Sequence, residues 1–380
     1  MSGKYFISAI IILSFQFFLY GCEPKVEKTE FNWQLRDGFP RPQTPVSNPM
    51  TNAKVELGRK IFYDKNLSFN QTQSCATCHQ QIFAFAENLQ TSVGSSGEKI
   101  RRNSPALVNI AYNKTLTWAH SGLDTIERQL LIPMFGENPV ELGISGHEEI
   151  VLSRFKSDEY QKLFESAFPE EDISFELIVK SLASFVRSLV SLDSPFDHYA
   201  YDGDDSALSE SALRGMNLFF SEKLECHHCH GGFNFTQSTF HEKQILDRKP
   251  FHNTGLYNVS VKGDYPAVDN GLYEITLNDS DKGKFRAPTL RNIEVTAPYM
   301  HDGSIATLEQ VIDFYAAGGR NIDSGNYQGD GRNNPLKSPF IKGFEISEQE
   351  KSDLINFLKS LTDQNFLTNK KYSEPVKDSS

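Results

Sequence analysis

The sequence predicts a mainly α-helical fold in which two domains are related by an internal duplication. Three observations predict it: a cysteine motif that occurs twice, similar segments around each copy, and amphipathic stretches separated by Gly-rich loops. The 380 residues suffice for two domains, and 38% of them are hydrophobic. The formal net charge of -11 and the lack of a long Lys/Arg run argue against nucleic acid as a partner.

The first residues have the pattern of an export signal. Lys4 precedes an apolar run from Tyr5 to Tyr20, which is too short and too close to the terminus for a membrane span. Leu19-Tyr20-Gly21-Cys22 resembles a bacterial lipobox, in which the cysteine becomes lipidated; a plain secretory signal or an uncleaved anchor is the alternative. We therefore expect an exported protein on the periplasmic side of a bacterial membrane, attached only through a lipid on Cys22.

Four of the five cysteines form two C-x-x-C pairs, each followed directly by histidine. These motifs are Cys75-Ala76-Thr77-Cys78-His79 and Cys226-His227-His228-Cys229-His230. In each motif the thiols suit thioether bonds to the vinyl groups of one haem, and the final histidine suits the proximal side of the iron. A four-cysteine zinc site would not need the histidine twice, and redox-active pairs would need a βαβ pattern. The sequence therefore predicts two covalently bound c-type haems, with the inner His227 and His228 pointing away from the iron.

Similar segments flank the two motifs in the same order, which indicates a duplication. The matching pairs are Gly58–Leu67 with Gly215–Leu224, Pro105–Ile110 with Pro288–Ile293, His120–Gly122 with His301–Gly303, and Thr125–Glu127 with Thr307–Glu309. In the last pair, Thr is typical of a helix N-cap and Glu of the positive first turn.

The duplication and the composition divide the chain into five parts. We expect a signal peptide over residues 1–22, a Pro-rich tether over 23–50, an N-terminal haem domain over 51–205, a C-terminal haem domain over 206–366 and a loose polar tail over 367–380. The apolar pattern predicts a helix from Phe175 to Leu192, and the spacing of Ser347 and Glu350 predicts a capping box at the last helix. Residues 255–284 and 318–334 should form loops, and any strands should be short.

The two halves differ in a way that predicts different chemistry at the two haems. Tyr315 lies eight residues after Thr307, whereas Pro133 lies eight residues after Thr125. If the helices superpose, a phenol caps the second haem while the first faces a side chain that cannot bind iron. Met300 is a rival ligand, Tyr315 could be a core residue, and Pro133 could end a helix. We expect a peroxide-accessible haem in the N-terminal domain and a six-coordinate, electron-transfer haem in the C-terminal domain.

Three residues near the open haem are candidates for its chemistry. Cleavage of a peroxide O–O bond benefits from a carboxylate that moves a proton between the oxygens, and Glu141 is preferred to Glu137 for this role. Glu141 and Glu137 could each instead face solvent. Gln129 is a further candidate from the same region. Trp118 suits electron or hole transfer between haems, with a buried packing role as the alternative.

The paired haem motifs and three further segments resemble the bacterial di-haem cytochrome c peroxidase and MauG superfamily over nearly all the mature chain. The segments are Asn103-Ser104-Pro105, Asn138-Pro139-Val140-Glu141 and Ala297–Gly303. The resemblance implies two cytochrome-c-like domains with Ca2+ at their interface. It also implies calcium ligation by the Asn103 side chain and the carbonyls of Thr296 and Pro298, an inter-haem Trp118, and a distal pocket of Gln129, Pro133 and Glu141. The match at Glu141 requires a small local insertion.

Two departures within the superfamily point to the MauG branch. Tyr315 falls where conventional di-haem peroxidases place Met and where MauG-type enzymes place Tyr. Those peroxidases also block the first haem with a histidine that is absent between His79 and Asn103. Phe31–Leu35, Gly38–Pro40 and Thr115–Trp118 further resemble the methanobactin-associated MbnH subgroup. Its members oxidise a tryptophan of a copper-binding partner, MbnP, to kynurenine.

Three functions are consistent with the ligands and the resemblance. The preferred one is a MauG-like peroxidase-type oxidoreductase that uses hydrogen peroxide to oxidise a protein substrate, such as a partner's tryptophan, through a high-valent two-haem state. The second is a conventional di-haem cytochrome c peroxidase that takes electrons from a small redox protein. The third is a non-enzymatic electron carrier, in which both irons should be saturated. Tyr315 separates the first two, because a Tyr-ligated haem is harder to reduce.

Overall fold

The computed structural model describes residues 31–244 and 250–376, and within these ranges the chain is mainly helical. The helices are α1 (Asn52–Tyr63), α2 (Cys75–Cys78), α3 (Ile126–Phe135), α4 (Glu148–Ser153), α5 (Asp158–Ala167), α6 (Phe175–Arg187), α7 (Pro195–Asp202), α8 (Glu210–Phe219), α9 (His227–His230), α10 (Tyr273–Thr276), α11 (Leu308–Ala316), α12 (Glu348–Lys359) and α13 (Gln364–Thr368). Strands β1 (Asn321–Ile322) and β2 (Gly329–Asp330) pair antiparallel, so the expected strands are indeed short.

None of the helices in the described ranges is long and apolar enough to cross a membrane. The proposed signal peptide, including Cys22, lies outside the described residues.

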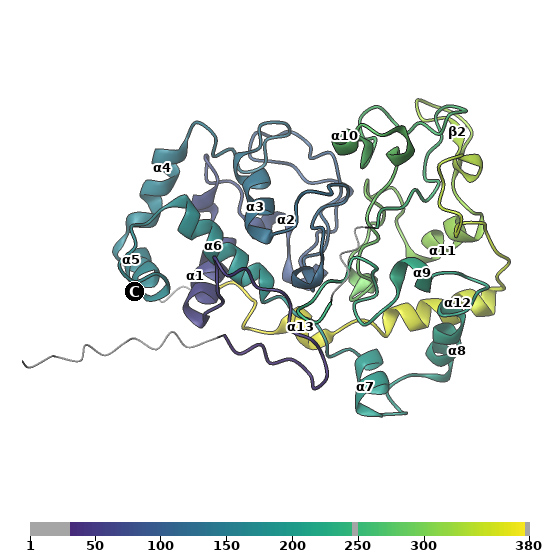
Figure 1. The fold of residues 1–380 in the computed structure, drawn as a ribbon, viewed down its shortest axis with the longest axis horizontal. Coiled ribbons are helices and arrows are strands. Elements are labelled where there is room, and N and C mark those ends of the chain that lie inside the picture. The colour runs from purple at the N-terminus through teal and green to yellow at the C-terminus, as the bar shows by residue number, and fades with distance from the viewer. Residues whose placement is uncertain (1–30, 245–249, 377–380) are drawn as a thin grey trace, which may run out of the picture.

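Two lobes are visible in Figure 1, with α1 to α6 in one and α7 to α12 in the other. Each lobe has its own hydrophobic core. Phe62 packs edge-on against Phe185 in the first core, and Phe219 packs against Phe357 in the second. These aromatic pairs join the helix before each haem motif to a helix near the end of the same half.

Both lobes close this helix crossing with a glycine. A Cβ atom on Gly58 of α1 would lie 1.9 Å from the carbonyl oxygen of Ser181 in α6. A Cβ atom on Gly215 of α8 would lie at the same 1.9 Å from the carbonyl oxygen of Asp353 in α12. Only glycine permits so close an approach of two backbones. The duplication seen in the sequence therefore extends to the packing of its helices.

A second duplicated device follows each haem motif. Asn109 and Asn292 both adopt left-handed backbone conformations, with φ of 54° and 59°. The amide oxygen of Asn109 accepts a 2.8 Å hydrogen bond from the backbone of Ser191, and that of Asn292 accepts one of 2.8 Å from the backbone of Asp363. The repeated Pro-x-Leu-x-Asn-Ile segment thus ties each half to the chain that leaves it.

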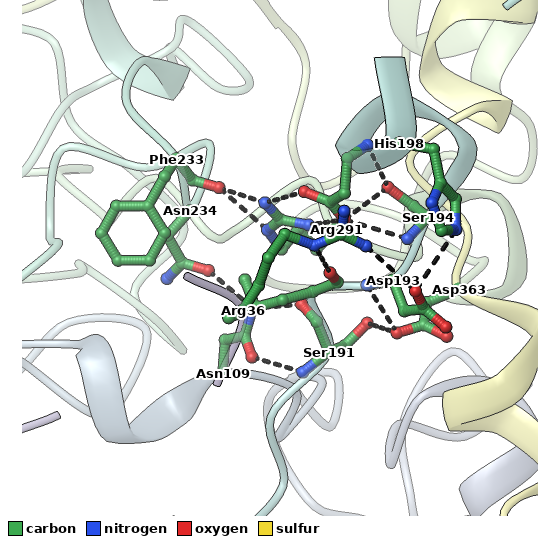
Figure 2. A network of polar contacts seen from close by, with 12 residues as sticks. Arg36, Asn109, Ser191, Asp193, Ser194, His198, Phe233, Asn234, Arg291 and Asp363 are labelled. Atoms are coloured by element: carbon green, nitrogen blue, oxygen red, sulfur yellow. Dashed lines mark hydrogen bonds and ion pairs between the residues drawn. The ribbon is translucent and has the colours of Figure 1, made fainter. Parts of the chain in front are cut away.

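A buried polar network connects the two lobes (Figure 2). Arg291 makes a bidentate ion pair with Asp197 at 2.8 Å, both side chains are fully buried, and Arg291 also donates to the carbonyl of Phe233. Asn109, from the first half, donates to Asn234 of the second half at 3.1 Å. Because buried polar groups are costly when unpaired, this network favours one relative placement of the lobes.

Two of the helices predicted from the sequence are present, one with the expected start and one with an earlier end. Ser347 caps α12 in a capping box with Glu350, as expected. The helix expected from Phe175 to Leu192 ends earlier, at Arg187, because Ser188 begins a turn that leads into the polar network.

The C-terminal segment is not loose as far as Tyr372. Leu367 and Tyr372 are buried in the core of the first lobe, and Gln81 donates to the carbonyl of Phe366 at 3.0 Å. Figure 1 shows the chain after α13 returning to the first lobe. The apolar side chains of this segment pack in the core of that lobe, so its polar composition was misleading.

Candidate functional site

The first C-x-x-C-H motif forms a short helix that presents its histidine inward. Cys75–Cys78 make up α2, capped by Ser74, and His79 follows directly. The Nδ1 atom of His79 lies 2.7 Å from the carbonyl oxygen of Phe85. A donated Nδ1–H fixes the tautomer and leaves Nε2 free as a ligand. Removal from water lowers the pKa of His79, which favours the neutral imidazole that binds metals.

The second motif repeats this arrangement in the other lobe. The Nδ1 atom of His230 lies 3.0 Å from the carbonyl oxygen of Pro288, and desolvation lowers the pKa of His230 to about 4. A largely apolar cavity opens beside this histidine. It is lined by Cys226, Cys229 and His230 together with Trp118, Met300 and Tyr315.

Arg286 provides an independent test of whether this cavity suits haem. Its guanidinium is buried and lines the cavity, and Nε donates to the carbonyl of Thr117 at 3.0 Å. Nη1 has no hydrogen-bond partner among the described residues, and burial lowers the pKa of Arg286 to about 10. A buried cation without an acid is costly, and a haem propionate would supply the missing charge and acceptor. The residues therefore fit the group that the motif predicts.

The helices that carry Tyr315 and Pro133 are equivalent in the structure. The hydroxyl of Thr125 accepts from the backbone of Arg128 at the start of α3, and that of Thr307 accepts from the backbone of Gln310 at the start of α11. Pro133 lies inside α3, which continues to Phe135, so it does not end the helix.

Tyr315 is partly buried, and removal from water raises the pKa of its phenol. Met300, the rival ligand, lines the same cavity. The structure thus brings both candidate ligands to the second haem cavity.

Glu141 is brought beside Pro133 by a loop that folds back onto α3. The backbone of Leu142 donates to the carbonyl of Pro133 at 2.9 Å, and that of Ile144 donates to Met134 at 3.0 Å. The loop after the first haem motif closes over it, because the backbone of Ser95 donates to the carbonyl of Glu141 at 2.7 Å. Desolvation raises the pKa of Glu141 to about 7, and its charge is near enough to influence Cys75.

Gln129 and Glu137 lie in different environments. Gln129 is one helical turn before Pro133, on the same face of α3. Its side-chain oxygen is buried and has no donor among the described residues. Glu137 is exposed and accepts a 2.7 Å hydrogen bond from Ser145. The two carboxyls therefore differ in their surroundings, because Glu141 is desolvated whereas Glu137 is exposed.

Trp118 lies between the parts of the chain that hold the two haem motifs. Its indole Nε1–H donates to the carbonyl of Asn103 at 2.8 Å, and its own carbonyl accepts from the backbone of Arg286 at 2.7 Å. Trp118 is buried and lines the second cavity together with Ala86, which follows the acceptor residue of His79. This position suits transfer of electrons between the sites.

The three residues expected to bind calcium also come together. Asn103, Thr296 and Pro298 all line the same cavity. The backbone of Asn103 donates to the carbonyl of His301 at 2.8 Å, which joins its loop to the segment that contains Pro298. The Asn103 amide nitrogen donates to the carbonyl of Leu89 at 3.0 Å, so its oxygen points the opposite way. An amide oxygen and backbone carbonyls are ligands that Ca2+ accepts.

The sequence reasoning did not single out Arg286. The signal was available in the repeat, because Arg286-Ala287-Pro288 aligns with Asn103-Ser104-Pro105. The second copy has the cation of Arg286 where the first copy has the amide of Asn103. This difference, directly before a duplicated segment, indicates that the two lobes use the position differently.

Comparison with known proteins agrees with this geometry. The family described as di-haem cytochrome c peroxidase matches residues 52–206. The methylamine utilization protein MauG of Methylorubrum extorquens is 32% identical over 332 residues, covering 86% of this chain and 84% of that protein. Cytochrome-c peroxidase IdrP1 of a Pseudomonas sp. is 33% identical over 340 residues, covering 85% of each.

Among solved structures, a MauG-like protein associated with microbial copper homeostasis shares 46% identity, with a TM-score of 0.89 over 91% of this chain and all of that one. The di-haem peroxidase BthA of Burkholderia thailandensis shares 19% identity with a TM-score of 0.65, covering 87% of this chain and 91% of that one, which supports the two-domain fold alone.

Proposed function

Since this chain belongs to the di-haem cytochrome c peroxidase and MauG family, and is therefore a peroxidase-type oxidoreductase with two c-type haems, we propose that it uses hydrogen peroxide to oxidise a tryptophan of a partner protein. One observation carries the proposal. The two lobes have equivalent helices, α3 and α11, with equivalent threonine caps. Tyr315 of α11 lines the cavity of the second haem, whereas the equivalent residue of α3 is Pro133. In this proposal Tyr315 would hold the iron of the second haem, whereas Pro133 would supply no ligand to the first.

The first lobe handles the peroxide proton. When bound, the two haems supply the irons that react with peroxide and hold its oxidising equivalents. Glu141, with a pKa of about 7, would accept a proton from one oxygen of the peroxide and return it to the other oxygen. Gln129 Oε1 would accept a hydrogen bond from the peroxide and orient it, and Pro133 has no atom that could ligate a haem held there.

The second lobe stabilises a centre that is oxidised at a distance from the peroxide. The Tyr315 oxygen is a harder, more electron-donating ligand than a thioether, so it favours oxidised states. Trp118 carries electrons between the lobes, and Arg286 neutralises a propionate. Asn103, Thr296 and Pro298 would hold Ca2+, and such binding would fix the loop that contains the acceptor of the Trp118 indole.

The remaining proposals concern location and partner. Export and lipidation at Cys22 would place the enzyme on the periplasmic side of a membrane. The two haem domains would span residues 51–205 and 206–366. The 46% identical protein is associated with copper homeostasis, which supports a copper-binding partner of the MbnP kind. An acidic chain would attract such a partner through a basic surface.

A conventional peroxidase is the second candidate, and two observations favour it. Several relatives are named cytochrome-c peroxidases, and Met300 lines the same cavity as Tyr315. If Met300 were the ligand, the second haem would readily take electrons from a small donor.

Two measurements separate these functions. Tyr315→Phe should shift the low-spin electron paramagnetic resonance signal of the second haem, while Met300→Leu should leave it in place; the reverse pattern would favour the conventional peroxidase. In the second measurement, peroxide is added to the purified protein together with a candidate copper-binding partner protein. Mass spectrometry should then find oxygen added to a partner tryptophan, and an unmodified partner would contradict the proposal.

A further inference from the structure

The second haem motif carries two histidines that the haem does not use. His227 and His228 stand between its cysteines, where the first motif has Ala76 and Thr77. They lie at the start of α9, directly after a turn in which the backbone of Glu225 donates to Ser221 and that of His228 donates to Glu225. The turn brings the carboxylates of Glu222 and Glu225 to the two imidazoles.

Three donor side chains converge at this place, and a fourth, Glu225, contacts one of them. The Nε2 atom of His227 lies 3.7 Å from Oε1 of Glu222, and Nε2 of His228 lies 3.6 Å from Oε2 of the same carboxylate. One donor atom from each of these three residues lies within 4.8 Å of the others. Glu225 adds an oxygen 2.6 Å from His228 Nε2. Metal bonds of roughly 2.0–2.2 Å bring neighbouring donors to about 3 Å, so the cluster needs only small side-chain shifts.

Ordinary ion pairing leaves the cluster incompletely satisfied. The Nε2 atom of His228 can carry one proton, but carboxylate oxygens from both Glu222 and Glu225 face it. Nδ1 of His227 is buried without a hydrogen-bond partner among the described residues. A cation at the centre would compensate two carboxylates at once, which a single proton cannot do.

The imidazoles are also held in place by their neighbours. The ring of His228 stacks on Phe340, with ring centroids 4.4 Å apart and planes 22° from parallel. The ring of His227 lies 4.2 Å from that of His228 and 6.4 Å from Phe220. Rings fixed in this way lose less freedom when they bind a metal.

We propose that Glu222, Glu225, His227 and His228 bind one divalent transition-metal ion beside the second haem motif. Two imidazole nitrogens with carboxylate oxygens suit Cu2+ or Zn2+, whereas Ca2+ and Mg2+ prefer sites made of oxygen alone. The site is separate from the haem iron, because Cys226, Cys229 and His230 serve the haem. It is independent of the proposed reaction and would persist whichever residue ligates the second iron.

The test uses the purified di-haem protein and CuCl2. After desalting, metal analysis should find one copper in addition to two irons, and electron paramagnetic resonance should show a Cu2+ signal with nitrogen hyperfine structure from two imidazoles. The His227→Ala/His228→Ala pair should lose this signal. Glu222→Gln, outside the haem motif, should weaken Cu2+ binding at least about tenfold while haem content stays constant.

His198→Ala is the matched control. His198 contacts Asp193 and Asp202, so it is a surface histidine between two acids, but no second histidine from the described ranges belongs to that cluster. Its replacement should leave Cu2+ stoichiometry and affinity unchanged. The proposal is overturned if the unmodified protein retains no copper beyond its irons, or if Glu222→Gln and the His227/His228 variant bind Cu2+ as tightly as the unmodified protein does.

Discussion

If Glu141 handles the peroxide proton as proposed, its carboxyl links the rate of the peroxide reaction to the pH of the solution. Removal from water raises its pKa from 4.5 to about 7. If Glu141 accepts the peroxide proton, the rate constant follows its ionised fraction, which falls about tenfold for each pH unit below 7 and is constant above 7. The Glu141→Gln side chain has nearly the same size and shape as glutamate, but its amide cannot accept the peroxide proton. At pH 8 we expect it to slow the peroxide reaction by roughly 100-fold to 10,000-fold.

The same burial predicts that Glu141→Gln stabilises the protein. The unfolded chain ionises near 4.5 and the folded protein near 7, so the folded state holds an extra proton between these values. Stability therefore falls as pH rises through this window and stays low above 7. The difference between the two pKa values corresponds to about 3 kcal/mol. The variant should exceed the parent by up to this amount at pH 8 and equal it at pH 4.

The assay combines two measurements on the same proteins. Stopped-flow absorbance follows the haem after peroxide addition from pH 5 to 9, and guanidinium unfolding gives the free energy of unfolding at pH 4 and pH 8. Glu137→Gln is the control, because Glu137 is exposed and hydrogen-bonded to Ser145. A parent rate that does not change with pH, or an equal loss of rate in the Glu137 variant, would refute the assignment of Glu141.

Three further predictions concern the scaffold and the calcium site. Gly58→Ala would place a Cβ atom 1.9 Å from the Ser181 carbonyl oxygen, so the free energy of unfolding should fall by about 1–3 kcal/mol or more; an unchanged melting temperature would contradict the helix crossing. Arg291→Met leaves Asp197 buried without its cation and should cost about 3–5 kcal/mol in guanidinium unfolding, and replacing Asp197 with Leu as well should restore most of the loss. Chelation of Ca2+ should alter the haem electron paramagnetic resonance spectrum of the parent but not of Asn103→Ala, and an equal response in both would remove Asn103 as a ligand.

Local chemistry explains which features the sequence could predict. Ser347 with Glu350 forms a capping box because both partners lie within one helical turn, and the hydrogen bonds of Thr125 and Thr307 are equally local. The haem motifs are local as well, since thiols and histidine occupy consecutive positions. Such features need no knowledge of tertiary structure.

Features that depend on distant partners could not be read in this way. Tyr372 stands in a polar stretch of sequence, yet its side chain is buried, because it packs in the core of the distant first lobe. The backbone bond from Leu142 to Pro133 brings the loop of Glu141 onto α3, where the Glu141 carboxyl is desolvated, whereas Glu137 is exposed. Arg286 is informative only because its guanidinium is buried without an acid among the described residues.

The duplication itself indicates which residues act in chemistry rather than in folding. Gly58 and Gly215 close the same helix crossing, so the requirements of the scaffold have kept these two positions alike. Where two equivalent positions hold different residues, a packing requirement shared by the two lobes cannot explain the difference. Pro133 and Tyr315 form such a pair, because each lies eight residues after the N-cap threonine of its helix, and Tyr315 lines the second haem cavity. With the scaffold held constant, the difference between an imino acid and a phenol is best explained by the ligand that each iron requires.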